Sequence, residues 1–190
     1  GLRVNHFASF DFLGFEKIVD SVGGVEICVD VTQREGYSFE LQEGCQEVNG
    51  LTTLNWIVSR STERLIGEKT IDSNGNDNST WELMPGVSDL TRIERQQYVV
   101  VQLIKELSEF NSINELNNFI NALEQAFTID ENLTLNKAVD LLWNLRGFDL
   151  SSVKKITTPI NYVKLEDGRQ VLILSENLTD FLLKEEVIGD

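Results

Sequence analysis

The residues best suited to chemistry lie in one short segment, which runs from Asp89 to Gln97. If this segment is helical, Arg92 and Gln96 share a face because they are four residues apart, and Asp89 lies one turn before Arg92. A guanidinium offers a planar fork of donors and an amide adds another, so the pair suits the oxygens of a phosphate. The alternative is a solvated helix face with a surface ion pair between Asp89 and Arg92, and the spacing alone favours this alternative.

Two further arginines are candidates for the same anion site. Arg60 follows an apolar run and could bring a second guanidinium to the phosphate. Arg95 belongs to the same helical segment but lies off the face that Arg92 and Gln96 share. We therefore expect Arg95 to contribute less to binding than Arg92 and to pair with a nearby acid.

Other kinds of site have little support in the sequence. The chain has one histidine and two cysteines, His6, Cys28 and Cys45, which are too few and too scattered for a structural zinc site. A Ser-His-Asp triad would have to use His6, close to the start of the sequence. The segment from Asp72 to Asp77 resembles the start of a calcium loop, but it lacks the glycine and the glutamate that such a loop needs further on. A solvated loop is the simpler interpretation.

The composition is that of an acidic globular protein. Sixteen basic and 31 acidic side chains give a formal net charge of −15 over 190 residues, which disfavours binding to a nucleic-acid backbone. The length suggests one domain, and no apolar run reaches the ~18 residues of a membrane span. The first residues lack the pattern of a signal peptide, and the absence of an initiator methionine suggests that residue 1 is not the natural start.

The candidate residues must be positioned by a unit of helices and strands. Asp11 can cap the N-terminus of a helix that Gly23 and Gly24 end, and the strict alternation over 25–31 predicts a strand directly after it. The segment 51–58 combines β-branched residues with a helical spacing of apolar ones, and we favour a short helix. A brief strand is expected before it, at residues 39–41.

The second half of the chain is predicted to be mainly helical. The polar segment 61–88 is too long for an idle connection and is interpreted as an insertion. A long helix follows from Ser88 or Asp89 to about Leu107, with a buried stripe of Leu90, Ile93, Gln97, Val100 or Val101, Ile104 and Leu107. Helices at 112–127 and 135–145, strands at 152–158, 162–165 and 170–174, and a terminal helix at 176–183 complete one α/β unit.

Four blocks of the sequence occur in a characteristic order. They are Phe10-Asp-Phe-Leu-Gly14-Phe, Val19-Asp-Ser-Val-Gly23-Gly-Val-Glu26-Ile-Cys28, Leu41-Gln-Glu-Gly44-Cys45-Gln-Glu-Val-Asn49-Gly50 and Asp89-Leu-Thr-Arg92-Ile-Glu-Arg95-Gln96-Gln97. In these blocks and their order the chain resembles the LytR-CpsA-Psr family. Residues 1–107 carry the resemblance, and residues 150–183 are compatible with the closing strands and helix of the family. The cysteine pair and the insertion with Trp81 look like the actinobacterial branch.

The resemblance implies a phosphotransferase outside the cytoplasmic membrane, anchored there by an N-terminal helix. Such enzymes move a cell-wall glycopolymer, of the teichoic acid, capsule or arabinogalactan type, from a polyprenyl-pyrophosphate carrier to peptidoglycan. The implied fold is an α/β/α sandwich with a central, mostly mixed sheet, helices on both faces and a core that accepts the polyprenyl chain. Arg92 and Gln96 should then face the pyrophosphate, with Arg60 as the second arginine of the family's R-x-R motif. Arg60 and Arg92 are the candidate catalytic residues.

The sequence also departs from the family pattern. Val58 stands where the R-x-R motif has its first arginine. Residues 1–190 resemble the C-terminal portion of the family's domain, interpreted as a single domain with the insertion at 61–88. Mg²⁺ is the cofactor that the resemblance implies, and its aspartate ligands belong to a part of the domain that precedes this segment. The alternative is a non-catalytic module of the same fold, which binds polyprenyl phosphate or serves as a scaffold.

Two expectations depend on this interpretation. Outside the membrane the compartment is oxidising, so Cys28 and Cys45 are expected to form a disulfide, with two buried thiols as the alternative. A segment without the opening strands of its sheet would expose strand edges and apolar helix faces, so we expect it to be marginally stable alone or to self-associate.

Overall fold

A computed structural model of the chain describes residues 8–84, 89–110, 112, 114–116, 119–121, 127–129, 137, 140 and 156–186. It divides into two compact units, which are His6–Val153 and the combination of Gly1–Asn5 with Lys154–Asp190. The helices expected at 112–127 and 135–145 and the strand expected at 152–158 lie largely outside the described residues. The expectation of a single domain stays a prediction.

Helix α1 spans Phe12–Ser21 and begins where the sequence indicates. The Asp11 carboxylate accepts a hydrogen bond from the Gly14 amide at 2.7 Å, which satisfies one of the free donors of the first turn. After the helix, Gly23 and Gly24 have φ angles of 94° and 113°, a left-handed conformation that glycine adopts without steric strain. They turn the chain into the next strand, as expected for a glycine pair behind a helix.

The next strand belongs to an antiparallel pair. β2 (Val25–Val29) pairs with β5 (Gly44–Val48), and Cys28 lies directly opposite Cys45. Burial along β2 alternates as predicted, with its valines and isoleucine inside and with Glu26 and Cys28 outside. A second, smaller pair joins β1 (Ala8–Phe10) to β8 (Phe127–Ile129).

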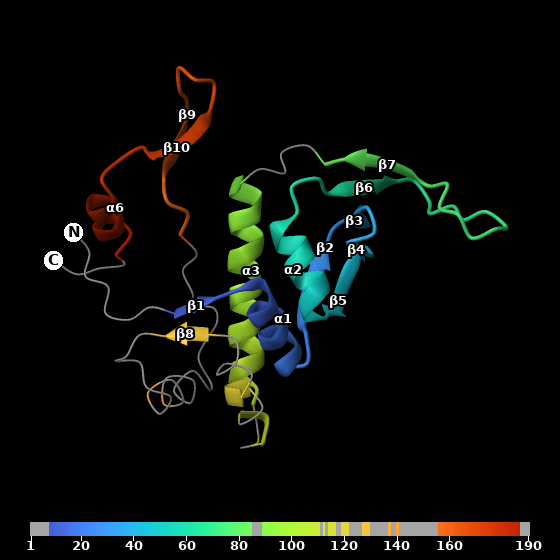
Figure 1. Cartoon of the computed structure of the whole chain (residues 1–190), viewed down its shortest axis with the longest axis horizontal. Coiled ribbons are helices and arrows are strands. Elements are labelled where there is room, and N and C mark those ends of the chain that lie inside the picture. Colours follow the sequence, from blue (N-terminus) through green and yellow to red (C-terminus); the bar gives the residue numbers. More distant parts are fainter. Residues whose placement is uncertain are drawn as a thin grey trace. The chain divides into compact units, whose positions relative to one another are not determined.

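A four-stranded sheet has the strand order β4–β3–β6–β7. Its strands are β4 (Phe39–Leu41), β3 (Gln33–Glu35), β6 (Glu63–Ile66) and β7 (Thr80–Leu83). β6 and β7 form a hairpin inside the predicted insertion, and its loop extends beyond β3 and β4 (Figure 1). Among the described residues every strand pair is antiparallel.

The hairpin is fixed to β3 through Arg34. The guanidinium donates to Glu63 at 3.0 Å and to Asp77 at 2.7 Å, and it lies 3.9 Å from the ring centroid of Trp81. Hydrogen bonds from Ser79, then from the Trp81 indole, and the charge of Arg34 lower the pKa of Asp77 to about 2. The polar loop therefore has an internal hydrogen-bonded structure and a defined attachment to the sheet.

Helix α2 spans Gly50–Val58, so the segment with the mixed signal is helical, as we favour from the sequence. It packs closely on α1 at Gly50, where a Cβ atom would lie 2.2 Å from the carbonyl oxygen of Glu16. The Gly50 amide also donates to the Asp20 carboxylate at 2.7 Å. Only glycine fits this crossing, because any side chain would collide with the backbone of α1.

Helix α3 spans Asp89–Ser108, close to the predicted limits. Of the predicted buried stripe, Leu107 is buried at 8% exposure, but Val100 is 55% exposed while its neighbour Val99 is 1% exposed. The inward-facing line consists of Arg95, Val99, Leu103 and Leu107, each four residues after the last. Residues 99–101 are all valine, so their spacing fits more than one helical face. The observed inward line also includes Arg95, and a pattern based on apolar residues does not detect an arginine.

The main core lies between the helices α1, α2 and α3 and the strands β2, β4 and β5. It consists of Phe15, Val19, Val25, Ile27, Val29, Phe39, Leu41, Val48, Leu54, Trp56, Ile57 and Val99. Val58, Tyr98 and Leu103 are half-buried and pack against this core. It therefore fixes α2 and α3, the two helices nearest to the predicted site residues.

The second unit contains a hairpin and a helix. β9 (Ile160–Lys164) pairs antiparallel with β10 (Gln170–Leu174), and Gly168 has a left-handed φ of 87° in the turn between them. The hairpin with its Asp-Gly turn is therefore confirmed. α6 (Leu178–Lys184) follows and is capped by Asn177, which confirms the terminal helix.

Candidate anion-binding site

Helix α3 carries two of the predicted site residues. Arg92 and Gln96 are one helical turn apart, and Arg92 is half-buried whereas Gln96 is exposed. The core residues Val99 and Leu107 hold this helix in place further along. The helix therefore presents a guanidinium and an amide on one side, as the spacing predicts. The predicted ion pair between Arg92 and the Asp89 side chain lies outside the described residues.

Arg60 lies in a short turn that follows α2 and is exposed. The two residues that bracket the turn are buried: Ser59 is 2% exposed and Thr62 is 0% exposed. Their hydroxyl oxygens are hydrogen-bonded to each other at 2.8 Å. The turn is thus closed by a buried bond while Arg60 projects from it.

Arg95 occupies a position that the sequence does not predict. The sequence groups it with the pyrophosphate-binding residues, whereas in the structure it is 7% exposed. Its Nη1 donates to the Trp56 carbonyl and to the Thr62 hydroxyl, both at 3.0 Å, and its Nη2 donates to the Gln33 side chain at 3.4 Å. Burial lowers the pKa of Arg95 and the nearby Glu35 carboxylate raises it. This burial does not support a direct contact between Arg95 and an anion.

Thr62 and Gln33 are site-supporting residues that sequence reasoning missed. Thr62 accepts from Arg95 and bonds to Ser59, and Gln33 accepts from Arg95 and from the Trp56 indole at 3.4 Å. Neither residue lies in a motif that points to chemistry. The sequence indicated this arrangement only through the position of Arg95, which lies four residues before Val99 and so on the inward line of α3.

Val58 replaces an arginine of the resembled motif and lies at the end of α2. Its side chain is half-buried and packs against the main core. Among the described residues, the predicted site therefore has Arg60 and Arg92 as its cations, with Gln96 as a neutral donor.

The described residues do not provide a ligand set for Mg²⁺. Within them, no group of three or more histidine, cysteine, aspartate or glutamate side chains is placed to hold a metal ion. In the loop that resembles a calcium site, Asp72 accepts from the amides of Asn74 and Asn76, both at 2.8 Å, so its oxygens serve the loop itself. We therefore assign no chemical step to Mg²⁺ in this segment.

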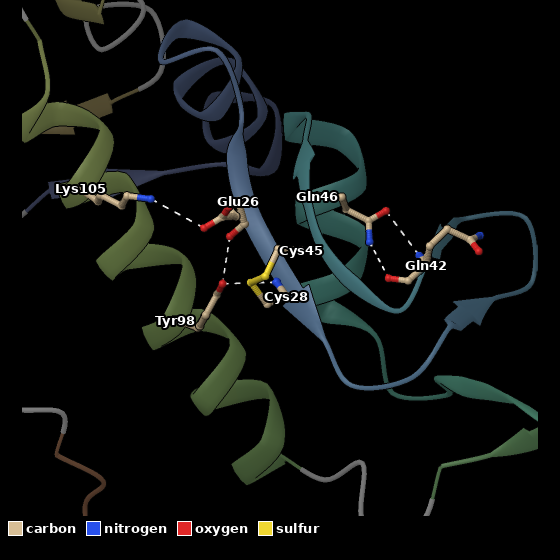
Figure 2. Close-up of a disulfide and its surroundings, with 7 residues drawn as sticks. All are labelled: Glu26, Cys28, Gln42, Cys45, Gln46, Tyr98 and Lys105. Carbon is tan, nitrogen blue, oxygen red and sulfur yellow. Dashed lines mark hydrogen bonds and ion pairs between the residues drawn. A yellow bond between two sulfur atoms is a disulfide. The ribbon is translucent and has the colours of Figure 1, made fainter.

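The expected disulfide between Cys28 and Cys45 is present in the structure. It joins opposite positions of β2 and β5 on their exposed side. Figure 2 shows Tyr98 of α3 directed at the same stretch of β2. The Tyr98 hydroxyl donates to the Glu26 carbonyl at 3.0 Å and accepts from the Cys28 amide at 3.3 Å. Lys105, also on α3, pairs with the Glu26 carboxylate at 3.7 Å.

An acidic pocket of about 200 Å³ lies between the end of α1, the β2–β5 pair and α3. It is lined by Val22, Gly23, Gly24, Glu26, Glu47, Lys105 and Glu106. Burial raises the pKa of Glu106, and the carboxylates of Glu109, Glu47 and Glu26 raise it further while Lys105 opposes them. The pocket is separate in character from the arginine site, because carboxylates rather than guanidinium groups surround it.

Comparison with solved structures identifies the class of fold. The LytR-Csp2A-Psr enzyme from Actinomyces oris has a TM-score of 0.70 to this chain, with 19% identity over 97% of this chain and 64% of that one. The predicted α/β fold class is therefore confirmed. The chain belongs to the LytR_cpsA_psr family, whose pattern matches residues 1–67 and 82–186.

Two curated relatives have names that refer to the cell wall. The chain is 26% identical to the cell wall biosynthesis protein LcpA of Corynebacterium glutamicum over 167 residues, which is 86% of this chain. It is 24% identical over 130 residues, or 68% of this chain, to TagU of Enterococcus faecalis, a polyisoprenyl-teichoic acid–peptidoglycan teichoic acid transferase. The chain spans 27% of the length of LcpA and 35% of the length of TagU.

The family match has a gap at residues 68–81, inside the predicted insertion. These residues form the loop of the β6–β7 hairpin and the start of β7. β6 itself, with Arg64, lies entirely within the matched residues. The gap in the family match therefore lies within the predicted insertion, whose bounds at 61–88 stay a prediction.

Proposed function

We propose that this protein is a phosphotransferase that moves a cell-wall glycopolymer from a polyprenyl-pyrophosphate carrier to peptidoglycan. The observation that carries the proposal is the family match, which includes the helix with Arg92 and Gln96. The teichoic acid transferase named among its relatives acts in the same class of reaction. Transfer of a phosphoryl group depends mainly on neutralising and positioning its charge, which is the chemistry that guanidinium groups supply.

In this proposal Arg92 and Gln96 bind the pyrophosphate from α3, and Arg60 binds it from the turn after α2. Arg92 and Arg60 would stabilise the negative charge that develops as the bond to the carrier phosphate breaks. Gln96 would orient the phosphate oxygens through its amide donor. Two observations support this arrangement. Arg92 and Gln96 lie on one side of α3, and Arg60 is exposed.

The location proposed is the outer side of the cytoplasmic membrane, with the protein anchored in that membrane. The disulfide supports an oxidising compartment. No described helix combines the length and the apolar character that spanning a bilayer requires. The implied partners are the lipid-linked glycopolymer and peptidoglycan, and the surplus of acidic side chains disfavours a nucleic acid.

A second candidate is a module that binds polyprenyl phosphate without transferring it. Val58 in place of an arginine favours this candidate, because it leaves the site with one guanidinium fewer than the family motif. The two functions differ in one measurement. With a labelled lipid-linked glycopolymer and peptidoglycan, an enzyme produces labelled peptidoglycan, whereas a binding module retains the lipid and produces none.

The site assignment is tested by titration of the full chain with a short-chain polyprenyl pyrophosphate in the presence of Mg²⁺. Charge-assisted hydrogen bonds contribute about 1.5–3 kcal/mol each, so Arg92→Ala should weaken binding by roughly ten- to a hundredfold. Arg64→Ala is the matched control, because Arg64 is a half-buried arginine paired with Glu82 on the hairpin. Equal dissociation constants for wild type and Arg92→Ala would refute the assignment.

A further inference from the structure

Arg95 makes contacts that link three parts of the fold. Arg95 is 7% exposed, so a ligand that approaches from solvent does not reach its guanidinium. One nitrogen, Nη1, donates both to the carbonyl of Trp56 in the last turn of α2 and to the hydroxyl of Thr62. These two acceptors lie on either side of Arg60 in the sequence. A single guanidinium group on α3 therefore contacts both ends of the segment that carries Arg60.

Thr62 fixes this segment through three hydrogen bonds. It is 0% exposed, and its hydroxyl accepts from Arg95 at 3.0 Å and bonds to Ser59 at 2.8 Å. Its carbonyl accepts from the Met84 amide at 2.9 Å, at the end of the hairpin. The Thr62 hydroxyl therefore joins α3 to the turn 59–62.

We propose that Arg95 is a positioning residue, which holds the turn with Arg60 in a fixed place relative to the side of α3 that carries Arg92 and Gln96. This role rests on the proposed function, in which both arginines bind one pyrophosphate. Arg95 follows Arg92 by one turn of the same helix. Movement of the turn relative to Arg95 therefore changes the position of Arg60 relative to Arg92.

The chemistry of the guanidinium explains why an arginine occupies this position. The group is planar and carries several donors in a fixed geometry, so it serves the Trp56 carbonyl, the Thr62 hydroxyl and Gln33 at the same time. The central carbon of the guanidinium also lies over the Trp56 ring, 5.1 Å from its centroid. A lysine has one nitrogen at the end of a flexible chain and would not serve these acceptors together.

The first test measures the turn without any ligand. Thr62→Val removes the hydroxyl while it keeps the shape of the side chain and leaves Arg95 in place. Thr53→Val is the matched control, because Thr53 is also 0% exposed but its hydroxyl donates to the carbonyl of Asn49, the N-cap of α2. Trypsin cleaves after exposed arginines, so the rate of cleavage between Arg60 and Ser61, followed by mass spectrometry, reports how firmly the turn is held.

We expect Thr62→Val to increase the rate of cleavage after Arg60 by about tenfold, because a buried charged donor loses its acceptor. The rate for Thr53→Val should stay within about twofold of wild type, as should cleavage after Arg169 in both variants. Equal rates of cleavage after Arg60 in the two threonine variants would overturn the proposal. The cleavage experiment tests whether Arg95 positions the turn even if the protein does not bind pyrophosphate.

The second test measures whether the turn acts through Arg60. Titrations with a short-chain polyprenyl pyrophosphate compare wild type, Thr62→Val, Arg60→Ala and the double variant. Thr62→Val should weaken binding by roughly five- to tenfold in the wild type and should have no effect in the Arg60→Ala background. Arg95→Lys should resemble Thr62→Val, because it keeps the charge but not the set of hydrogen bonds.

The outcomes separate the two hypotheses. Absence of pyrophosphate binding by wild type refutes the proposed function, while the cleavage rates still decide the role of Arg95. Binding by wild type together with an equal loss from Thr62→Val in both backgrounds means that Thr62 does not act through Arg60, which overturns the positioning role. A loss that depends on Arg60, together with faster cleavage after Arg60, supports it.

Discussion

Removal of the disulfide is expected to lower the stability of the protein by a predictable amount. The bridge between Cys28 and Cys45 closes a loop with a sequence separation of 17. In the chain-entropy model, a loop of this length stabilises the folded state by about 3 kcal/mol, because it restricts the unfolded chain. Both cysteines are exposed, so replacing them with serine removes little buried apolar surface. The loop entropy should therefore account for most of the change.

The experiment compares the Cys28→Ser, Cys45→Ser double variant with wild type in urea denaturation and thermal melting. For a chain of this length, a loss of about 3 kcal/mol corresponds to a fall of roughly 6–12 °C in melting temperature. Wild type in a reductant should fall to the same value as the variant. The variant is its own control for side effects of the reductant, because it should melt at one temperature with and without it.

Two results would contradict the reasoning. A change of less than about 1 kcal/mol in the double variant would mean that the loop is already restricted in the unfolded chain. A much larger loss would mean that the bridge also holds native contacts, such as those of Tyr98 with β2. The Tyr98 hydrogen bonds go to backbone atoms, so they should survive the substitution.

Two further predictions concern stability. Gly50→Ala should destabilise the protein by at least about 1–3 kcal/mol, because the added Cβ would lie 2.2 Å from the Glu16 carbonyl oxygen; chemical denaturation measures this, with exposed Leu51→Ala as the control. The raised pKa of Glu106 means that its stabilising contribution is complete below its ordinary pKa of 4.5 and is lost as the pH rises through the folded value. Glu106→Gln should therefore melt above wild type at pH 7 and level with it near pH 4, and Glu94→Gln, exposed on the same helix, should show no such difference.

The elements with a local signal could be predicted from the sequence. The Asp11 cap, the glycine pair behind α1 and the alternation of β2 each depend on neighbouring residues alone, and the structure confirms all three. The pairing of Cys28 with Cys45 followed from the compartment that the family resemblance implied. In each case, the local sequence or the number of cysteines left few alternative structures.

The features that depend on distant residues could not be predicted. The four-residue strands β6 and β7 are short and charged, and they pair within a segment that is otherwise polar. The direction of Arg95 depends on Trp56 and Thr62, which are 39 and 33 residues away in the sequence. A helical face shows which residues lie together but not which face the core covers. The sequence therefore groups Arg95 with the anion-binding candidates, as a lesser contributor, and does not place it in the protein interior.

The contact of Tyr98 with β2 also bears on how the protein avoids unwanted association. In the described part of the chain β2 pairs with β5 alone, so no described strand lies along its other edge. A strand that added there would need the Glu26 carbonyl and the Cys28 amide, and the Tyr98 hydroxyl already occupies both. One side chain thus supplies the acceptor and the donor that an extra strand would otherwise offer. Edge-to-edge growth of fibrils from β2 would first require α3 to detach.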